Sequence, residues 1–376
     1  MIPFNKPFLS GEELHFIEES IQAGHISGNG IFTKRCHQFF LERYRFKKVL
    51  LTTSCTDALE MCALLLNIEP GDEVIVPSYT FVSTALAFVR QGAKIVYMDS
   101  RPDHPGLDET QLEALITPRT KAIIVVHYAG VACDMDAIMQ LADKHGVFVV
   151  EDAAQAIDSY YKGHPLGGIG HLGTFSFHET KNIQSGEGGL LIINDEQFIE
   201  RAEILWEKGT NRAAFFKGMV DKYRWVDVGS SFLPSDLTAA YLFAQLLSLE
   251  KIQQSRLTIW ENYFTLLKPL EQKELFSLPF IPDYATNNGH MFYLVFSQAT
   301  LRDRFIQILK EKGALSIFHY LSLHKSPFHL SQKQTTYECR YADHYSESLL
   351  RLPFYVGLED SFEELNRHIL STIQEL

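Results

Sequence analysis

Residues 147–156 read VFVVEDAAQA, an apolar run that ends in two acidic residues before a short loop, and this run decides the fold class. Six similar runs alternate with stretches of helical spacing: KVLLT (48–52), EVIVP (73–77), KIVYMD (94–99), KAIIVVH (121–127), GTFSFH (173–178) and GLLIIND (189–195). Strands that are apolar along their whole length and are separated by helices are typical of a parallel sheet covered on both faces. The sequence therefore predicts an α/β fold with a mostly parallel seven-stranded sheet.

The pattern changes after about residue 250. A long helical stretch comes first, and shorter apolar runs and a second helix follow it: KIQQSRLTIWENYFTLL (251–267), HMFYLVF (290–296), LRDRFIQILKEKG (301–313) and LSIFHY (315–320). We therefore predict a large domain over residues 1–250 and a smaller α+β domain over residues 251–376.

A short helix is expected near the start of the chain. Ser10 and Glu13 have the spacing of a capping box. Leu14, Ile17 and Ile21 then recur at helical spacing, which predicts an amphipathic helix.

The composition excludes several classes of function. The formal net charge of -12 and the lack of clustered basic residues argue against a nucleic-acid partner. No apolar stretch is long enough to span a membrane, and the first residues lack a signal-peptide pattern, so we expect a cytoplasmic protein. Five scattered cysteines without a CxxC pair predict neither a disulfide framework nor a zinc site, and we expect no metal.

Asp152 and Lys181 are the strongest candidates for chemistry. Asp152 ends a buried strand at the edge of the sheet where α/β proteins bind ligands, and Lys181 follows the next strand. A carboxylate there needs a cationic partner, such as the protonated ring nitrogen of pyridoxal phosphate (PLP). A desolvated lysine could form a Schiff base with the PLP aldehyde and then transfer protons. Taken alone, either residue is more often a helix cap or a surface charge.

Other residues fit the remaining parts of that cofactor. Gln155 lies on the same turn as Asp152 and could reach the phenolic oxygen. The segment TTSCTDALE (52–60) joins a strand to a helix start, where free N–H groups favour a phosphate. Ser176 could add a hydroxyl, and Phe81 could stack on the ring, although a core position is the commoner role of a phenylalanine.

The order of these motifs resembles the DegT-type sugar aminotransferases of the fold-type I PLP superfamily. The resemblance is carried by TSCT (53–56), PSYTFVST (77–84), HYAGVACDMD (127–136), EDAAQA (151–156), FSFHETKN (175–182) and GEGG (186–189). It runs nearly from end to end of the chain. It implies a fold-type I architecture and an aminotransferase that uses PLP.

The resemblance also implies a role for each site residue. Lys181 would be the Schiff-base lysine, Asp152 would pair with the pyridine nitrogen, Gln155 would contact the phenolic oxygen, and Phe81 would stack on the ring. The phosphate would be held by Cys55, Thr56 and Ser176 and by Asn211 of a neighbouring subunit. The expected assembly is therefore a homodimer with shared active sites.

The substrates are also implied by the resemblance. GTNR (209–212), residues 222–242, HY with LH (319–324) and RLPFY (351–355) resemble members that make dTDP-4-amino-4,6-dideoxygalactose from L-glutamate and dTDP-4-keto-6-deoxyglucose. A cluster after the LSIFHY strand could contact the sugar or its diphosphate: His319, Tyr320, His324 and Lys325. Amination at C3, or of a differently linked nucleotide sugar, is the alternative.

Other classes of function fit less well. Sugar dehydratases of the same superfamily carry histidine where Lys181 stands. A non-catalytic binding or regulatory protein on the same scaffold would not need that lysine. A nicotinamide reductase is disfavoured because LGGIG (166–170) is too short for the dinucleotide-binding motif.

Overall fold

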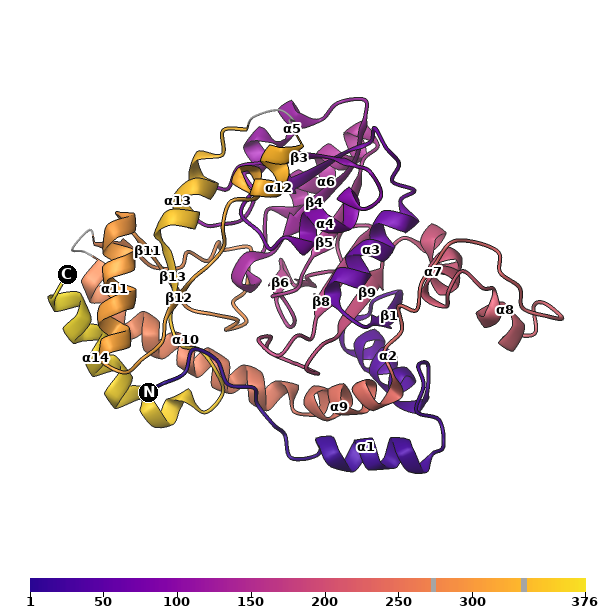
Figure 1. Ribbon diagram of the computed structural model, residues 1–376, viewed down its shortest axis with the longest axis horizontal. Coiled ribbons are helices and arrows are strands. Elements are labelled where there is room, and N and C mark those ends of the chain that lie inside the picture. The colour runs from indigo at the N-terminus through magenta and orange to yellow at the C-terminus, as the bar shows by residue number, and fades with distance from the viewer. Residues whose placement is uncertain (272–274, 333–336) are drawn as a thin grey trace.

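The computed structural model describes residues 1–271, 275–332 and 337–376, and a seven-stranded sheet forms its centre (Figure 1). The strand order is β1–β9–β8–β5–β4–β2–β3. The bounds are Lys48–Thr52 (β1), Glu73–Pro77 (β2), Lys94–Met98 (β3), Thr120–Val126 (β4), Phe148–Asp152 (β5), Leu172–Ser176 (β8) and Gly189–Ile193 (β9). β9 is antiparallel to both neighbours, and the other neighbouring strands are parallel. The predicted mostly parallel seven-stranded sheet is confirmed.

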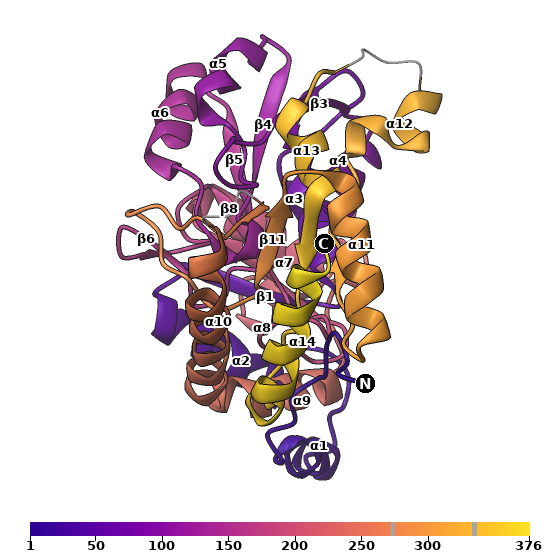
Figure 2. The same ribbon diagram turned by 90° about the vertical axis from the view of Figure 1, so that its left-hand side faces the viewer.

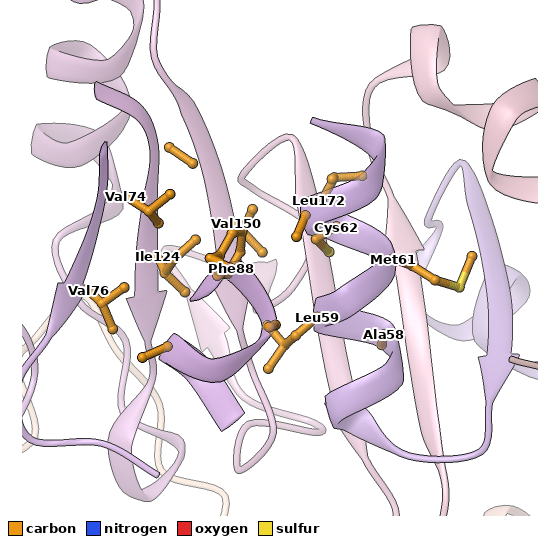
Figure 3. Packing of buried hydrophobic residues seen from close by; sticks show 14 of the residues in the cluster. Ala58, Leu59, Met61, Cys62, Val74, Val76, Phe88, Ile124, Val150 and Leu172 are labelled. Carbon is orange, nitrogen blue, oxygen red and sulfur yellow. The ribbon is translucent and has the colours of Figure 1, made fainter. Parts of the chain in front are cut away.

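Helices cover both faces of this sheet because alternate strand residues point to opposite sides. One core contains Val74, Val76 and Ile124 and lies under α3 (Cys55–Leu65), α4 (Ser83–Val89) and α7 (Ile199–Trp206). Figure 3 shows the side chains of α3 and α4 packed towards the strands. The other core contains Ile75 and Ile123 and lies under α2 (Ile31–Tyr44), α6 (Met135–His145) and α9 (Asp236–Leu247).

A second sheet lies in the C-terminal part of the chain. Its four antiparallel strands have the order β10 (Phe276–Ser277), β11 (Tyr293–Phe296), β13 (Leu349–Arg351) and β12 (Ile317–Phe318). It shares a core with α10 (Leu249–Glu271), α11 (Ala299–Glu311) and α14 (Phe362–Gln374), and Figure 2 shows α11 beside α14. This composition agrees with the predicted α+β character.

The start of the chain packs with this second sheet. The backbone N–H of Ile2 donates to the carbonyl of Gly313 at 2.7 Å, and Ile2 belongs to the same core as α14. The division of the chain after residue 250 stays a prediction, and the first residues lie with the C-terminal part.

Helix α1 (Glu13–Gln22) forms where a helix was expected, but its capping differs in detail. The Glu13 carboxylate accepts from the backbone N–H groups of Ser10 and Gly11, whereas the Ser10 hydroxyl accepts from the N–H of Glu12. The helix also exposes Leu14, at 80%, and Ile21, at 56%. The side of α1 that packs on α9 carries Phe16 and Ser20 instead.

A projecting arm follows α7. It comprises residues 209–230, includes α8 (Arg212–Phe216) and extends away from the rest of the molecule (Figure 1). Phe216 is 70% exposed on this arm and Trp225 is 82% exposed. None of the helices in the described ranges is long and apolar enough to cross a membrane.

Candidate active site

A cavity of about 610 Å³ lies at the carboxyl edge of the large sheet and extends to the second sheet. Cys55 and Asp152 line it from the large sheet, and His319 and Arg351 line it from the second sheet. Most of the predicted site residues surround this cavity: Cys55, Thr56, Phe81, Asp152, Gln155, Ser176, Lys181, His319 and Tyr320. The fold therefore brings together groups from both parts of the chain.

Asp152 is the last residue of β5, and its carboxylate is buried. The hydroxyl of Thr84 donates to Oδ2 at 2.7 Å, and the backbone N–H of Ala154 donates to Oδ1 at 3.2 Å. Burial raises the pKa of Asp152, and these two neutral donors oppose that effect. A buried carboxylate whose hydrogen-bond donors are both neutral is suited to a cationic ligand group, such as a protonated ring nitrogen.

Lys181 follows β8 in a turn in which its N–H donates to the carbonyl of His178. Burial lowers the pKa of the Lys181 amine to about 8, and the charge of Arg351 acts in the same direction, while Cys55 and Asp152 oppose it. This environment favours the neutral amine, which is the nucleophilic form of a lysine. The position and pKa of Lys181 fit a Schiff-base lysine.

Gln155 connects the two sides of the cavity. Its Oε1 accepts from the backbone N–H of Ala129 at 2.6 Å, and its Nε2 donates to the hydroxyl of Tyr320 at 3.1 Å. The second N–H of the Gln155 amide remains available to a ligand oxygen. Phe81 packs near Tyr320, with ring centroids 6.0 Å apart, and could cover the face of a bound ring.

The N-terminus of α3 forms the end of the cavity that suits a phosphate. Ser54 caps the helix by accepting from the N–H of Asp57, and the first-turn N–H groups of Cys55 and Thr56 have no acceptor within the helix. The Thr56 hydroxyl donates to Ser83, which also lines the cavity. Burial raises the pKa of the Cys55 thiol, so a neutral thiol stands beside this anion site.

A glycine of the GEGG segment makes this end of the cavity possible. A side chain at Gly189 would place its Cβ 2.4 Å from the carbonyl carbon of Ser54. Only glycine therefore allows β9 to approach the start of α3 so closely.

The glycine-rich segment LGGIG has a structural role in this region. The backbone N–H groups of Gly167, Ile169 and Gly170 all donate to the carboxylate of buried Glu151. His127 contacts the same carboxylate at 2.9 Å. These backbone N–H groups bind the Glu151 side chain and not a ligand. The glycines of LGGIG can therefore be explained by this contact, and no bound dinucleotide is needed to account for them.

Two predicted substrate residues, His324 and Lys325, are not among the described residues that line the cavity. His324 is buried, and its Nδ1 lies 2.6 Å from the hydroxyl of Ser78. Lys325 forms an ion pair with Asp343 at 2.7 Å. Both belong to a short 3-10 helix (Leu323–Lys325), which follows β12 in the chain.

Asn211 also lies away from the cavity of its own chain. It precedes α8 on the arm, and its Oδ1 accepts from the backbone N–H of Arg224 at 2.7 Å. A contact with a cofactor phosphate would have to be made in another subunit.

Arg351 and His290 line the cavity but were not predicted. Arg351 begins the RLPFY segment, so the sequence signal was a charged residue within an apolar run (349–356). The Nδ1–H of His290 donates to the Oδ1 of Asn182, the residue after Lys181, at 2.8 Å. Nothing in the local sequence distinguishes His290 from other histidines.

Comparison with known proteins shows the family of the chain. Residues 7–370 match the model of the DegT/DnrJ/EryC1/StrS aminotransferase family. The chain is 32% identical over 369 residues to the spore coat polysaccharide biosynthesis protein SpsC of Bacillus subtilis, covering 96% of this chain and 93% of SpsC.

Solved structures show the same architecture. The aminotransferase TlmJ of Streptoalloteichus hindustanus is 28% identical with a TM-score of 0.91, and the two chains are covered to 100% and 99%. DesV of S. venezuelae is 28% identical with a TM-score of 0.88, with coverage of 100% and 98%. The PLP-form of the sugar aminotransferase Spr1654 of Streptococcus pneumoniae is 25% identical with a TM-score of 0.88, with coverage of 99% of each chain.

The cavity offers what PLP requires, because a helix N-terminus for the phosphate, a lysine of lowered pKa and a buried carboxylate line the same space. The family match covers nearly the whole chain, and aminotransferases of this family use PLP. The chain therefore belongs to the DegT/DnrJ/EryC1/StrS aminotransferase family and is a PLP-dependent sugar aminotransferase.

Proposed function

We propose that the enzyme transfers an amino group from L-glutamate to dTDP-4-keto-6-deoxyglucose and forms dTDP-4-amino-4,6-dideoxygalactose. The choice of this nucleotide sugar follows the resemblance of residues 209–212, 222–242 and 351–355. The observation that carries the proposal is the cavity itself, in which Lys181 and Asp152 face the polar side chains His319 and Tyr320. Its volume of about 610 Å³ lies within the usual range for small-molecule sites.

Lys181 transfers protons, and other residues of the cavity bind the cofactor. When bound, PLP would supply an aldehyde and a ring that withdraws electrons from the reacting carbon. The neutral amine of Lys181 takes up and returns the proton at that carbon. Asp152 keeps the ring nitrogen protonated, and Gln155 donates to the phenolic oxygen. Thr56, Ser83, Ser176 and the first turn of α3 hold the phosphate.

The neutral imidazole ring of His319 is a candidate for orienting the sugar. Burial lowers its pKa well below the usual value, with Arg351 and Lys181 acting in the same direction. Its Nδ1 lies 3.0 Å from the hydroxyl of Tyr128, and a neutral ring carries a single proton, on either Nδ1 or Nε2. As a neutral ring, His319 can form one hydrogen bond with a sugar hydroxyl through Nε2, as donor or acceptor.

We also propose a homodimer whose two active sites are shared. The exposed side chains of the arm and of α1 support this proposal, including Phe216, Trp225, Leu14 and Ile21. Apolar groups of this size are seldom left in water when they lie together on a surface. Asn211 on the arm would then complete the phosphate site of the neighbouring subunit.

The substrate proposal is tested by incubating the PLP-loaded enzyme with L-glutamate and dTDP-4-keto-6-deoxyglucose and by NMR of the product. We expect an axial amine at C4, which defines the galacto product. An equatorial amine at C4, an amine at C3, or conversion only of another nucleotide sugar would contradict it.

A further inference from the structure

Arg351 is a buried cation without a protein counter-ion. It is the last residue of β13, it is 9% exposed, and it lines the cavity. Its Nε has no hydrogen-bond partner, and its guanidinium forms no ion pair with any residue in the described ranges. The ring of Phe4 lies 4.9 Å from the guanidinium carbon, and the nearby hydroxyls belong to tyrosines. Burial of an unpaired charge is costly, so this arrangement suits an anionic ligand group.

Three anionic groups could enter the cavity: the cofactor phosphate, a carboxylate of the amino donor and the diphosphate of the nucleotide sugar. The start of α3, with Ser83 and Ser176, already provides donors for the cofactor phosphate. That end of the cavity belongs to the large sheet, whereas Arg351 belongs to the second sheet. The choice is therefore between the donor carboxylate and the sugar diphosphate.

The place of Arg351 in the same cavity as Lys181 favours the carboxylate. The positive charge of Arg351 also adds to the larger effect of burial in lowering the pKa of Lys181. In an α-amino acid the carboxylate is bonded to the carbon that carries the amine. In a nucleotide-linked 4-keto sugar the diphosphate is attached at C1, across the ring from the reacting carbon. A cation in the cavity of the reacting amine is therefore better placed for the α-carboxylate of the donor than for the diphosphate of the sugar.

We propose that Arg351 binds the α-carboxylate of the amino donor and selects α-amino acids as donors. This inference rests on the proposed function, because it concerns the donor of that reaction. The fork of two guanidinium N–H groups matches the two oxygens of a carboxylate. The backbone of Phe4 accepts from the N–H of Phe354, so the residue that covers Arg351 is anchored to the segment that follows β13.

The test compares the wild-type holoenzyme with Arg351→Gln, Arg351→Lys and a remote control, Arg90→Gln. Arg90 lies on the surface of the large domain in an ion pair with Glu60. The first measurement follows the loss of the yellow cofactor absorbance with increasing L-glutamate in the absence of a keto-sugar. The second is calorimetric binding of glutarate, a dicarboxylate that cannot react.

We expect Arg351→Gln to weaken both glutarate binding and the kcat/KM of the glutamate reaction by about 10- to 100-fold. Arg351→Lys keeps the positive charge but loses the paired N–H groups of the guanidinium. Its glutarate affinity and kcat/KM should therefore lie between those of Arg351→Gln and the wild type. Arg90→Gln should stay within about twofold of the wild type. The same Arg351 variants, loaded with pyridoxamine phosphate, should react with the keto-sugar with an almost unchanged KM.

Unchanged glutarate binding in Arg351→Gln, with the cofactor absorbance intact, would overturn the inference. A loss confined to the keto-sugar reaction would also overturn it and would assign Arg351 to the diphosphate. Failure of the wild type to aminate any nucleotide keto-sugar would instead contradict the proposed acceptor, and the glutarate measurement would still decide the role of Arg351.

Discussion

The ionisation of Lys181 can be predicted with a magnitude from the structure. The pKa of about 8 leaves its amine neutral in about one-tenth of the cofactor-free molecules at pH 7. A lysine at the model value of 10.5 would be neutral in only about one molecule in 3,000. The cavity therefore raises the reactive fraction of Lys181 by roughly 300-fold at neutral pH.

Trace acetylation of the cofactor-free protein with acetic anhydride measures this fraction. Peptides are quantified by mass spectrometry between pH 6 and pH 11, with the exposed Lys6 as an internal reference. We expect the labelling of Lys181 to rise with a midpoint near pH 8. Two variants test the electrostatic cause, because Asp152 raises the pKa of Lys181 and Arg351 lowers it. Asp152→Asn should lower the midpoint, and Arg351→Gln should raise it.

A wild-type midpoint near pH 10.5 would refute the reasoning, because burial would then have no effect on Lys181. Shifts of both variants in the same direction would refute the electrostatic part. Lys6 is labelled in the same reaction and reports any change in the reactivity of acetic anhydride with pH. An altered midpoint of Lys181 relative to Lys6 could therefore not be attributed to the reagent.

Three further predictions concern activity, assembly and stability. Asp152→Asn should lower kcat by about 10²- to 10³-fold while the thermal unfolding curve changes little, because a neutral amide cannot stabilise a protonated ring nitrogen; near-normal turnover would exclude the proposed role. Mixing Lys181→Ala with Asn211→Ala should restore about a quarter of the sites after random subunit exchange, since half of the dimers are mixed and each has one intact site; exchange shown by mass labelling without any recovery of turnover would contradict shared sites. Lys181→Met should stabilise the cofactor-free protein by about 1–3 kcal/mol at pH 7 in urea unfolding, because a folded pKa below the unfolded value costs stability below pH 8, and this gain should fade as the pH rises towards 10.5.

The main features of the fold could be predicted because they depend on local patterns. Each of the seven apolar runs became a strand of the large sheet, since a strand buried on both faces needs apolar residues throughout. Asp152 and Lys181 could be paired because both follow strands at the carboxyl edge of one sheet. Their place in one cavity follows from strand order, which places β5 beside β8.

The contacts of the second sheet could not be predicted from spacing. His319 and His324 are five residues apart, yet the first lines the cavity and the second lies under Ser78, because the chain turns between them. Arg351 is 170 positions from Lys181, and only the packing of β13 brings it to the cavity. For α1, the spacing predicted a helix but could not show that Leu14 would be exposed in a single chain.

The most direct test of the account is to identify the lysine that carries the cofactor. The PLP-loaded enzyme is reduced with borohydride and digested, and the modified peptide is identified by mass spectrometry. We expect one pyridoxyl phosphate group per chain on Lys181, and we expect the label to disappear when L-glutamate is added before reduction. Label on another lysine, or label on Lys181 that L-glutamate does not remove, would contradict the account.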